Sequence, residues 1–369
     1  MTTRDFGHRV LVVDDSAFMR KAIPMLLAKE PGLEVVGVAR DGQDALDKIR
    51  DLQPDVVTLD IEMPVMDGLT ALPKIMALPT PRPLVIVCST LTTDGSQAAL
   101  KAMRLGAVDF ITKDPQAIGA SNESFRLDLI AKLRAVLEHR PRRALTASPV
   151  RPGPTPAKTA TLPTQAPSHF TLGTRAFGLV LIGSSTGGPP ILETVLNAIP
   201  ADFGAPLVIA QHMPALFTTS LAARLNEQCK IAVEHADTSR PLRAGVAYVI
   251  KGGMQGVIRR GSGYQLDITD QPPDALYKPS VDVLLASAAA PAGRDALGVI
   301  LTGMGADGSL GGRRLHSTGG MLIAQAAESC AVYGMPRAAF DAGITSAMLL
   351  PAQIGQALAT MRASKLRAA

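Results

Sequence analysis

Short apolar runs alternate with amphipathic stretches along both halves of the chain. Runs of this kind, bounded by turn residues, predict buried strands. In the first half they lie at 9–15, 33–39, 55–60, 84–88 and 107–112. In the second half they lie at 179–183, 206–210, 245–250 and 296–302. Strands that alternate with helical stretches are typical of a parallel sheet covered by helices. The pattern therefore predicts an α/β protein with two doubly wound parallel-sheet domains.

The segment between the two halves has a different composition. Residues 139–175 are rich in proline, alanine and threonine and contain few large apolar side chains. Such a segment cannot bury enough apolar surface to fold, so we expect a semi-extended linker. The predicted domains are then 1–138 and 176–369, joined by this linker.

The chain is basic, and most of the excess charge lies in the linker. The whole sequence has 37 basic and 32 acidic residues and a pI near 9.2. Six of the basic residues and none of the acidic ones lie in 139–175, which leaves 31 basic against 32 acidic residues elsewhere. A nucleic-acid-binding face on either domain is therefore disfavoured. The linker is expected to act as a spacer, with docking on an acidic partner as the alternative.

The sequence gives no signal for export or membrane insertion. No run approaches the ~20 apolar residues of a membrane span, and the charged start Met1-Thr-Thr-Arg-Asp5 does not resemble a signal peptide. The three cysteines are scattered and form neither a C-x-x-C pair nor a zinc-binding spacing. We expect a cytoplasmic protein.

Polar side chains follow several of the predicted strands of the first half: Asp14, Asp15, Asp60, Ser89 and Lys113. Because the carboxyl ends of parallel strands meet at one edge of a sheet, these side chains should lie close together. Three carboxylates suit Mg²⁺, which binds a few carboxylates together with water and phosphate. A lysine and a hydroxyl opposite them would contact the oxygens of a phosphoryl group.

Over roughly 7–125 this half resembles the receiver domain of two-component response regulators. The resemblance rests on Val-Asp-Asp-Ser at 13–16, Leu-Asp-Ile-Glu-Met-Pro-Val-Met-Asp-Gly-Leu at 59–69 and Gly-Ala-Val-Asp-Phe-Ile-Thr-Lys at 106–113. It implies a flavodoxin-like fold, a phosphoacceptor and a Mg²⁺ site. The residues implied are Asp60 as acceptor, Asp14, Asp15 and Asp60 as metal ligands, Ser89 and Lys113 as phosphate contacts, and Phe110 as the aromatic that reports the active state.

Two positions depart from the receiver pattern. Lys113 is followed by Asp114 where receivers usually have proline, which bears on the geometry of that loop. Pro24 falls inside the first predicted helix, which should start at Ala17 with Ser16 as N-cap. A proline there removes one helical hydrogen bond and favours a kink.

Candidate nucleophile, base and acid follow three strands of the second half. The run Leu179-Val-Leu-Ile-Gly-Ser-Ser-Thr-Gly-Gly188 leads into Pro189-Pro190 and a predicted helix, so it reads as a strand, a turn and a helix start. It fits G-x-S-x-G centred on Ser185. His212 and Asp307 follow two further strands, which completes the groups required for acyl transfer. His235 is the runner-up as base, and Ser184 as nucleophile.

The second half resembles the chemotaxis protein-glutamate methylesterases, a Rossmann-like serine esterase family. The motifs are Ile-Gly-Ser-Ser-Thr-Gly-Gly at 182–188, Gln-His-Met-Pro at 211–214, Lys-Pro-Ser-Val-Asp-Val-Leu at 278–284, Gly-Val-Ile-Leu-Thr-Gly-Met-Gly-Ala-Asp-Gly at 298–308 and Tyr-Gly-Met-Pro at 333–336. The resemblance implies Ser185 as nucleophile, His212 as base, Asp307 as the acid that orients it, and the Met304 backbone N–H in the oxyanion hole. No metal or cofactor is implied in this half.

The same resemblance implies a function and partners. The enzyme would remove methyl esters from glutamate side chains of chemoreceptor cytoplasmic domains, deamidate specific glutamines, and be activated when a chemotaxis histidine kinase phosphorylates the receiver. It would be recruited to receptor arrays. Two stretches depart from the family: Tyr277 stands where histidine is common, and Ile250-Lys-Gly-Gly-Met-Gln255 differs from the usual motif. Both lie outside the proposed triad, so we expect them to bear on substrate contacts and not on the chemistry.

Two other classes of function remain as alternatives. One is a non-enzymatic response regulator whose second domain binds DNA or protein, although that half offers no helix-turn-helix candidate. The other takes 183–188 as a phosphate-binding loop, although the Gly-Lys-Ser/Thr ending of a P-loop is absent.

Overall fold

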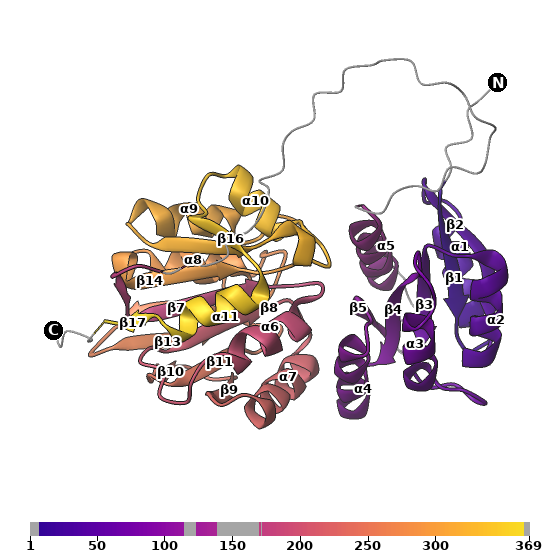
Figure 1. Ribbon diagram of the computed structural model, residues 1–369, viewed down its shortest axis with the longest axis horizontal. Helices are drawn as coiled ribbons and strands as arrows, with labels where there is room; N and C mark the ends of the chain where they lie inside the picture. Colours follow the sequence, from indigo (N-terminus) through magenta and orange to yellow (C-terminus); the bar gives the residue numbers. More distant parts are fainter. Residues whose placement is uncertain (1–6, 114–122, 139–169, 171, 365–369) are drawn as a thin grey trace, which may run out of the picture.

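The computed structural model describes residues 7–113, 123–138, 170 and 172–364. These residues form two α/β units (Figure 1). Most of the predicted linker, 139–169 and 171, lies outside the described residues, as does Asp114. Among the helices that are described, none is both long and apolar enough to cross a membrane.

The first unit is a five-stranded parallel sheet in the order β2-β1-β3-β4-β5, with helices on both faces. This order places β1 and β3 side by side, so the residues that follow them share one edge. The elements are β1 (His8–Val13), α1 (Met19–Leu27), β2 (Leu33–Ala39), α2 (Gly42–Leu52), β3 (Val56–Asp60), α3 (Gly68–Met76), β4 (Leu84–Thr90), α4 (Thr93–Arg104), β5 (Asp109–Lys113) and α5 (Glu123–Leu137). The doubly wound, flavodoxin-like prediction is confirmed.

Several helices of this unit begin at a side chain that caps their free N–H groups. Asp41 accepts a hydrogen bond from Asp44 N at the start of α2, and Thr92 accepts one from Gly95 N at the start of α4. The expected start of α1 at Ala17 is wrong, because the helix begins at Met19. The Ser16 hydroxyl accepts from Met19 N at 3.4 Å, so Ser16 precedes a turn at 17–18 that leads into α1. Pro24 lies inside α1, which continues to Leu27.

The second unit is a seven-stranded parallel sheet in the order β16-β15-β14-β7-β8-β11-β9. Its central strands are buried on both faces, as expected for a parallel sheet under helices. The elements of the sheet and its helices are β7 (Leu179–Ser184), α6 (Gly188–Asn197), β8 (Leu207–Gln211), α7 (Ala215–Gln228), β9 (Ala232–Ala236), β11 (Val246–Ile250), α8 (Val281–Ala288), β14 (Ala296–Ile300), α9 (Ser309–Ser317), β15 (Met321–Gln325), α10 (Met335–Asp341), β16 (Ala347–Leu349) and α11 (Pro351–Ala359).

Smaller elements complete this unit and were not predicted. A separate three-stranded antiparallel sheet, in the order β10-β13-β12, is made by β10 (Arg240–Pro241), β12 (Gln255–Arg260) and β13 (Tyr264–Thr269). A short parallel pair joins β6 (Ala176–Phe177) to β17 (Arg362–Ala363). Two short 3₁₀ turns lie at η1 (Gly293–Asp295) and η2 (Ala327–Ser329).

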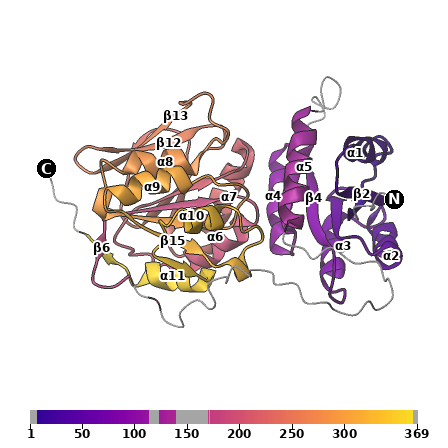
Figure 2. The same cartoon turned by 90° about the horizontal axis from the view of Figure 1, so that it is seen from above.

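The two units meet along the α4, β5 and α5 side of the first sheet (Figure 2). Helix α4 packs on α6 and α7 of the second unit. The buried hydroxyls of Ser96 and Ser220 lie 2.6 Å apart across this boundary. The rings of Phe110 and Phe217 stack with centroids 4.3 Å apart and planes 4° apart. The edge of the first sheet therefore covers α7 and the loops around it.

Candidate functional site

Ser185 lies on a sharp turn between β7 and α6. Its N–H donates to Thr302 O at 3.0 Å, and Gly187, two residues later, has φ of 75°. Glycine adopts this left-handed backbone without strain. The turn also packs closely against the loop after β14, because a Cβ at Gly303 would lie 2.8 Å from Ser185 Cβ. The serine is thus fixed where two loops meet at the carboxyl end of the sheet.

The two adjacent serines have different surroundings. Ser184 is fully buried, and its Oγ donates to Gln211 Oε1 at 2.5 Å. Gln211 Nε2 in turn donates to Ser185 O at 3.0 Å, so this pair braces the turn. Ser185 is 8% exposed and lines a cavity of about 510 Å³. Of the two, Ser185 has the access that a nucleophile requires.

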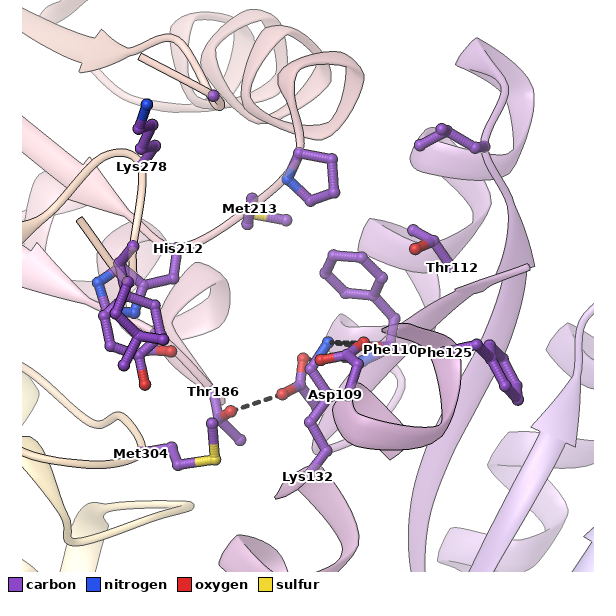
Figure 3. A pocket seen from close by; sticks show the side chains of 17 residues that line it. Asp109, Phe110, Thr112, Phe125, Lys132, Thr186, His212, Met213, Lys278 and Met304 are labelled. Carbon is purple, nitrogen blue, oxygen red and sulfur yellow. Dashed lines mark hydrogen bonds and ion pairs between the residues drawn. The ribbon is translucent and has the colours of Figure 1, made fainter. Parts of the chain in front are cut away.

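His212 follows β8 and faces Asp307. His212 Nε2 lies 2.8 Å from Asp307 Oδ2. Because an ionised carboxylate only accepts hydrogen bonds, Nε2 carries the proton. Among the described residues Nδ1 is buried without a hydrogen-bond partner. Nδ1 is therefore the basic nitrogen, and His212 lines the same cavity as Ser185 (Figure 3).

Asp307 is held by the start of α8. Its Oδ1 accepts from Ser280 Oγ at 2.9 Å and from Asp282 N at 2.8 Å, and its Oδ2 accepts from Val281 N at 2.7 Å. Burial alone would raise the pKa of Asp307, but the hydrogen bond to His212 and these backbone N–H groups hold that pKa below its ordinary value. The carboxylate therefore stays ionised beside the imidazole.

The imidazole also has an aromatic neighbour. The Tyr277 ring stacks on His212 with centroids 4.1 Å apart and planes 7° apart. In the sequence Tyr277 stood out only as a departure from the family pattern, at a position expected to bear on substrate contacts. No periodicity reports such a contact, because residues 212 and 277 belong to different loops.

Met304 lies in the loop that approaches Ser185 and lines the same cavity. This loop is fixed by Gly303, whose N–H donates to Val332 O and whose carbonyl accepts from the N–H groups of Gly334 and Met335. In Figure 3 the Met304 side chain lies beside Thr186, across the cavity from Met213. The position fits a backbone donor near the nucleophile.

The runner-up base has different contacts. His235 lies on β9, next to β11 at the end of the sheet, and its Nε2 is 3.1 Å from Thr218 Oγ1. His235 is absent from the residues described as lining the cavity with Ser185. The geometry therefore favours His212 as the base.

The predicted acidic cluster of the first unit assembles at the ends of β1 and β3. One carboxylate oxygen each from Asp14, Asp15 and Asp60 lies within 4.8 Å of the others. Lys113 Nζ lies 2.6 Å from Asp14 Oδ2 and 2.7 Å from Asp60 Oδ2. Burial raises the pKa of Asp60 to about 6, although Lys113 opposes this shift.

The donor set of this cluster fits Mg²⁺. Asp14 Oδ2 is buried, and its close partner among the described residues is the Lys113 ammonium 2.6 Å away. Hard carboxylate oxygens held this close are ligands that Mg²⁺ prefers. Ser89 is buried at the neighbouring strand end, but its Oγ donates to Gly95 O at 2.7 Å and so faces the start of α4 here.

A buried carboxylate of the first unit reaches the serine turn of the second. Thr186 Oγ1 donates to Asp109 Oδ2 at 2.6 Å (Figure 3). Burial raises the pKa of Asp109, against the charge of Lys132 and the Thr186 hydrogen bond. Lys132 Nζ donates to Phe110 O at 2.7 Å. Sequence reasoning missed Asp109 and Thr186, because each looks ordinary within its own domain.

Both halves of the chain match known protein families. Residues 10–118 match the family model "Response regulator receiver domain", and residues 180–358 match "CheB methylesterase". Protein-glutamate methylesterase/protein-glutamine glutaminase 1 of Oleidesulfovibrio alaskensis is 46% identical over 363 residues, covering 95% of this chain and 98% of its own. The protein of the same name numbered 2 in Nitratidesulfovibrio vulgaris is 49% identical, covering 91% of this chain and 94% of its own.

Among solved structures, the chain is similar to the CheB methylesterase catalytic domain of Thermotoga maritima. The two are 34% identical with a TM-score of 0.48, over 50% of this chain and 97% of that one. The full-length relatives decide the assignment, since their matches extend over both units. The chain belongs to the CheB methylesterases, the family of receiver-linked enzymes named protein-glutamate methylesterase/protein-glutamine glutaminase, as its sequence predicted.

Proposed function

We propose that this protein hydrolyses methyl esters of glutamate side chains on chemoreceptor cytoplasmic domains and deamidates specific glutamines there, for sensory adaptation. The observation that carries the proposal is the hydrogen bond between His212 and Asp307, with His212 lining the same cavity as Ser185. The names of the relatives support the substrate class. The test is methanol release from a methylated receptor fragment. Each enzyme molecule should release many molecules of methanol, and no release should occur without enzyme.

The proposed chemistry is a two-step acyl transfer. Nδ1 of His212 takes the proton of the Ser185 hydroxyl as its oxygen attacks the ester carbonyl. The tetrahedral oxyanion is stabilised by backbone N–H groups that include Met304. The imidazolium then gives its proton to the departing methoxide, and methanol leaves. A water molecule, deprotonated by the same imidazole, then attacks the acyl-serine, and the imidazolium returns the proton to the Ser185 oxygen as glutamate is released.

Asp307 orients this base and stays ionised throughout. Its hydrogen bonds to Ser280, Val281 and Asp282 fix the carboxylate, which fixes the Nε2–H tautomer of His212. A negative carboxylate at this place also stabilises the imidazolium that forms in the transition state. The chemistry in this unit uses protein groups alone.

The first unit is proposed as a phosphorylation switch. A chemotaxis histidine kinase would transfer a phosphoryl group to Asp60, with Lys113 and, after it turns away from Gly95, Ser89 contacting the phosphoryl oxygens. Asp14, Asp15 and Asp60 would hold Mg²⁺, which neutralises the developing negative charge when bound. Phe110 is proposed as the aromatic whose position reports the active state. The protein is proposed to work in the cytoplasm, recruited to receptor arrays.

We further propose that the unphosphorylated receiver covers the esterase site. The contacts that support this are the Asp109–Thr186 hydrogen bond beside Ser185 and the Phe110 stack on Phe217. Cavity residues come from both units, so we expect a receptor helix to reach Ser185 only after the receiver has moved. Phosphorylation at Asp60 would shift a two-state equilibrium toward the uncovered form.

Asp60→Asn is expected to abolish stimulation by a small phosphodonor and to leave basal turnover in place. The amide has nearly the shape of the carboxylate but cannot form the acyl phosphate. Methanol release is measured with and without phosphodonor and Mg²⁺. Wild-type enzyme treated with EDTA should behave like the variant. Full stimulation of Asp60→Asn would show that another residue accepts the phosphoryl group.

Ser96→Arg is expected to raise the basal activity of unphosphorylated protein toward the phosphorylated level. Ser96 is fully buried against Ser220, so a long charged side chain cannot fit in the closed arrangement. Ser96→Ala is the matched control, with a change of about fivefold or less, because it removes only the hydroxyl contacts to Thr93 O and Ser220 Oγ and adds no volume. Basal activity that stays low in Ser96→Arg, with the receiver still phosphorylated normally, would contradict the covering role.

A further inference from the structure

The flat face of His212 is covered by a residue of another loop. The parallel rings of His212 and Tyr277 lie 4.1 Å apart. The carboxylate of Asp307 holds the imidazole at one atom, Nε2. A single hydrogen bond leaves the ring able to rock about the bond that joins it to Cβ, since this torsion has broad minima. A second, planar contact removes that freedom.

Tyr277 belongs to the same short segment that holds Asp307. Gln255 Nε2 donates to Tyr277 O at 2.8 Å, and Gln255 Oε1 accepts from Ser280 N at 2.7 Å. Ser280 Oγ then donates to Asp307 Oδ1 at 2.9 Å. Gln255, which is fully buried, thus fixes the Tyr277 ring relative to the residues that hold the Asp307 carboxylate. The ring plane of His212 and its Nε2 hydrogen bond are therefore both set by residues that Gln255 links together.

The Tyr277 hydroxyl lies near the loop after β14. A Cβ built on Gly305 would be 3.5 Å from this oxygen. Burial, with the charge of Asp307, raises the pKa of Tyr277, so the phenol remains neutral. The ring and the hydroxyl are therefore separable by substitution: phenylalanine keeps the flat surface and loses the oxygen.

We propose that Tyr277 is a positioning residue for the general base, acting through its ring. The stack keeps the imidazole plane fixed, with Nε2 bound to Asp307 and Nδ1 left to take the proton of Ser185. This inference rests on the proposed triad. It explains how a chain with tyrosine at a position where its family often has histidine keeps an ordered base.

The test compares Tyr277→Ala with Tyr277→Phe in the full-length protein, activated with Mg²⁺ and a small phosphodonor. For Tyr277→Ala we expect kcat for methanol release to fall about tenfold to a hundredfold with KM changed less than about threefold, because only alignment of the base is lost. Tyr277→Phe should stay within about twofold of wild type. Phe340→Ala, which removes a half-exposed ring on α10 away from the cavity, is the matched control and should match wild type.

Labelling of Ser185 by a small fluorophosphonate gives a second readout. It reports activation of the nucleophile without the receptor, so it should slow in Tyr277→Ala in proportion to kcat and recover in Tyr277→Phe. Thermal unfolding checks that each variant is folded. If Tyr277→Ala does not fold, Tyr277→Leu keeps much of the volume without the flat ring and should show the same loss.

Three results would overturn the proposal. Wild-type kcat and labelling in Tyr277→Ala would show that the stack does not position the base. An equal loss in Tyr277→Phe would assign the effect to the hydroxyl. A rise in KM alone would make Tyr277 a substrate contact. Ser185→Ala in the same series distinguishes a failure of this proposal from a failure of the proposed triad. If that variant still turns over substrate, the triad itself is wrong, whatever Tyr277 does.

Discussion

Ser185→Ala is expected to lower methanol release by about ten thousandfold or more, to the level left by binding and the oxyanion hole. The reason is that no other hydroxyl is equivalently placed. Ser185 lines the cavity with His212, whereas its neighbour Ser184 is fully buried and bonded to Gln211. The measurement is turnover of a methylated receptor fragment by phosphorylated protein, with thermal unfolding to show that the variant is folded.

Ser184→Ala is the matched control for this prediction. Its hydroxyl donates to Gln211 Oε1, so its loss should destabilise the fold by about 1 kcal/mol while most turnover remains. The opposite pattern, with Ser184→Ala inactive and Ser185→Ala active, would make Ser184 the nucleophile. Activity in both variants would exclude an acyl-serine at this turn.

Asp307→Asn is expected to lower kcat by about a thousandfold to ten thousandfold, with the site otherwise intact. The amide cannot hold His212 in the Nε2–H tautomer or stabilise its charged form. Its NH₂ group must also face one of the donors that now bind the carboxylate, namely Ser280 Oγ, Val281 N or Asp282 N. We therefore expect a loss of about 1–3 kcal/mol in the free energy of unfolding.

The pH dependence of this stability difference has a definite sign. The pKa of Asp307 is lower in the folded protein than the ordinary value of an aspartate. Its stabilising contribution is therefore fully present above the unfolded pKa and is lost as the pH falls through the folded value. Unfolding of wild type and Asp307→Asn should converge at acid pH and differ most near neutrality. Asp341→Asn, an exposed carboxylate on α10, is the control that should show no such pattern.

The positions of the strands along the chain explain why the residues of the candidate site could be predicted from the sequence. Asp14, Asp60 and Lys113, and likewise Ser185, His212 and Asp307, each follow an apolar run that periodicity identifies as a strand. In a parallel sheet all such residues emerge at the same edge. The strand pattern and the motifs therefore indicated which side chains converge, and the structure places both sets together.

Contacts between loops could not be predicted in this way. The stack of Tyr277 on His212 joins two loops, and the bond from Thr186 to Asp109 joins two domains. Neither residue pair is part of a helical or strand repeat, so no pattern reports the distance between them. The antiparallel β10-β13-β12 sheet was missed for a related reason: its strands are short and partly exposed, and their apolar signal is weak.

The sequence by itself determined the two α/β units, the family, and the residue types delivered to each strand end, because apolar periodicity and local motifs encode these. Only the tertiary structure decided the nitrogen of His212 that faces Asp307, the serine with access to the cavity, and the residues of the first unit that line the same cavity. These depend on side-chain packing between segments far apart in the chain, where a difference of an ångström separates a hydrogen bond from none.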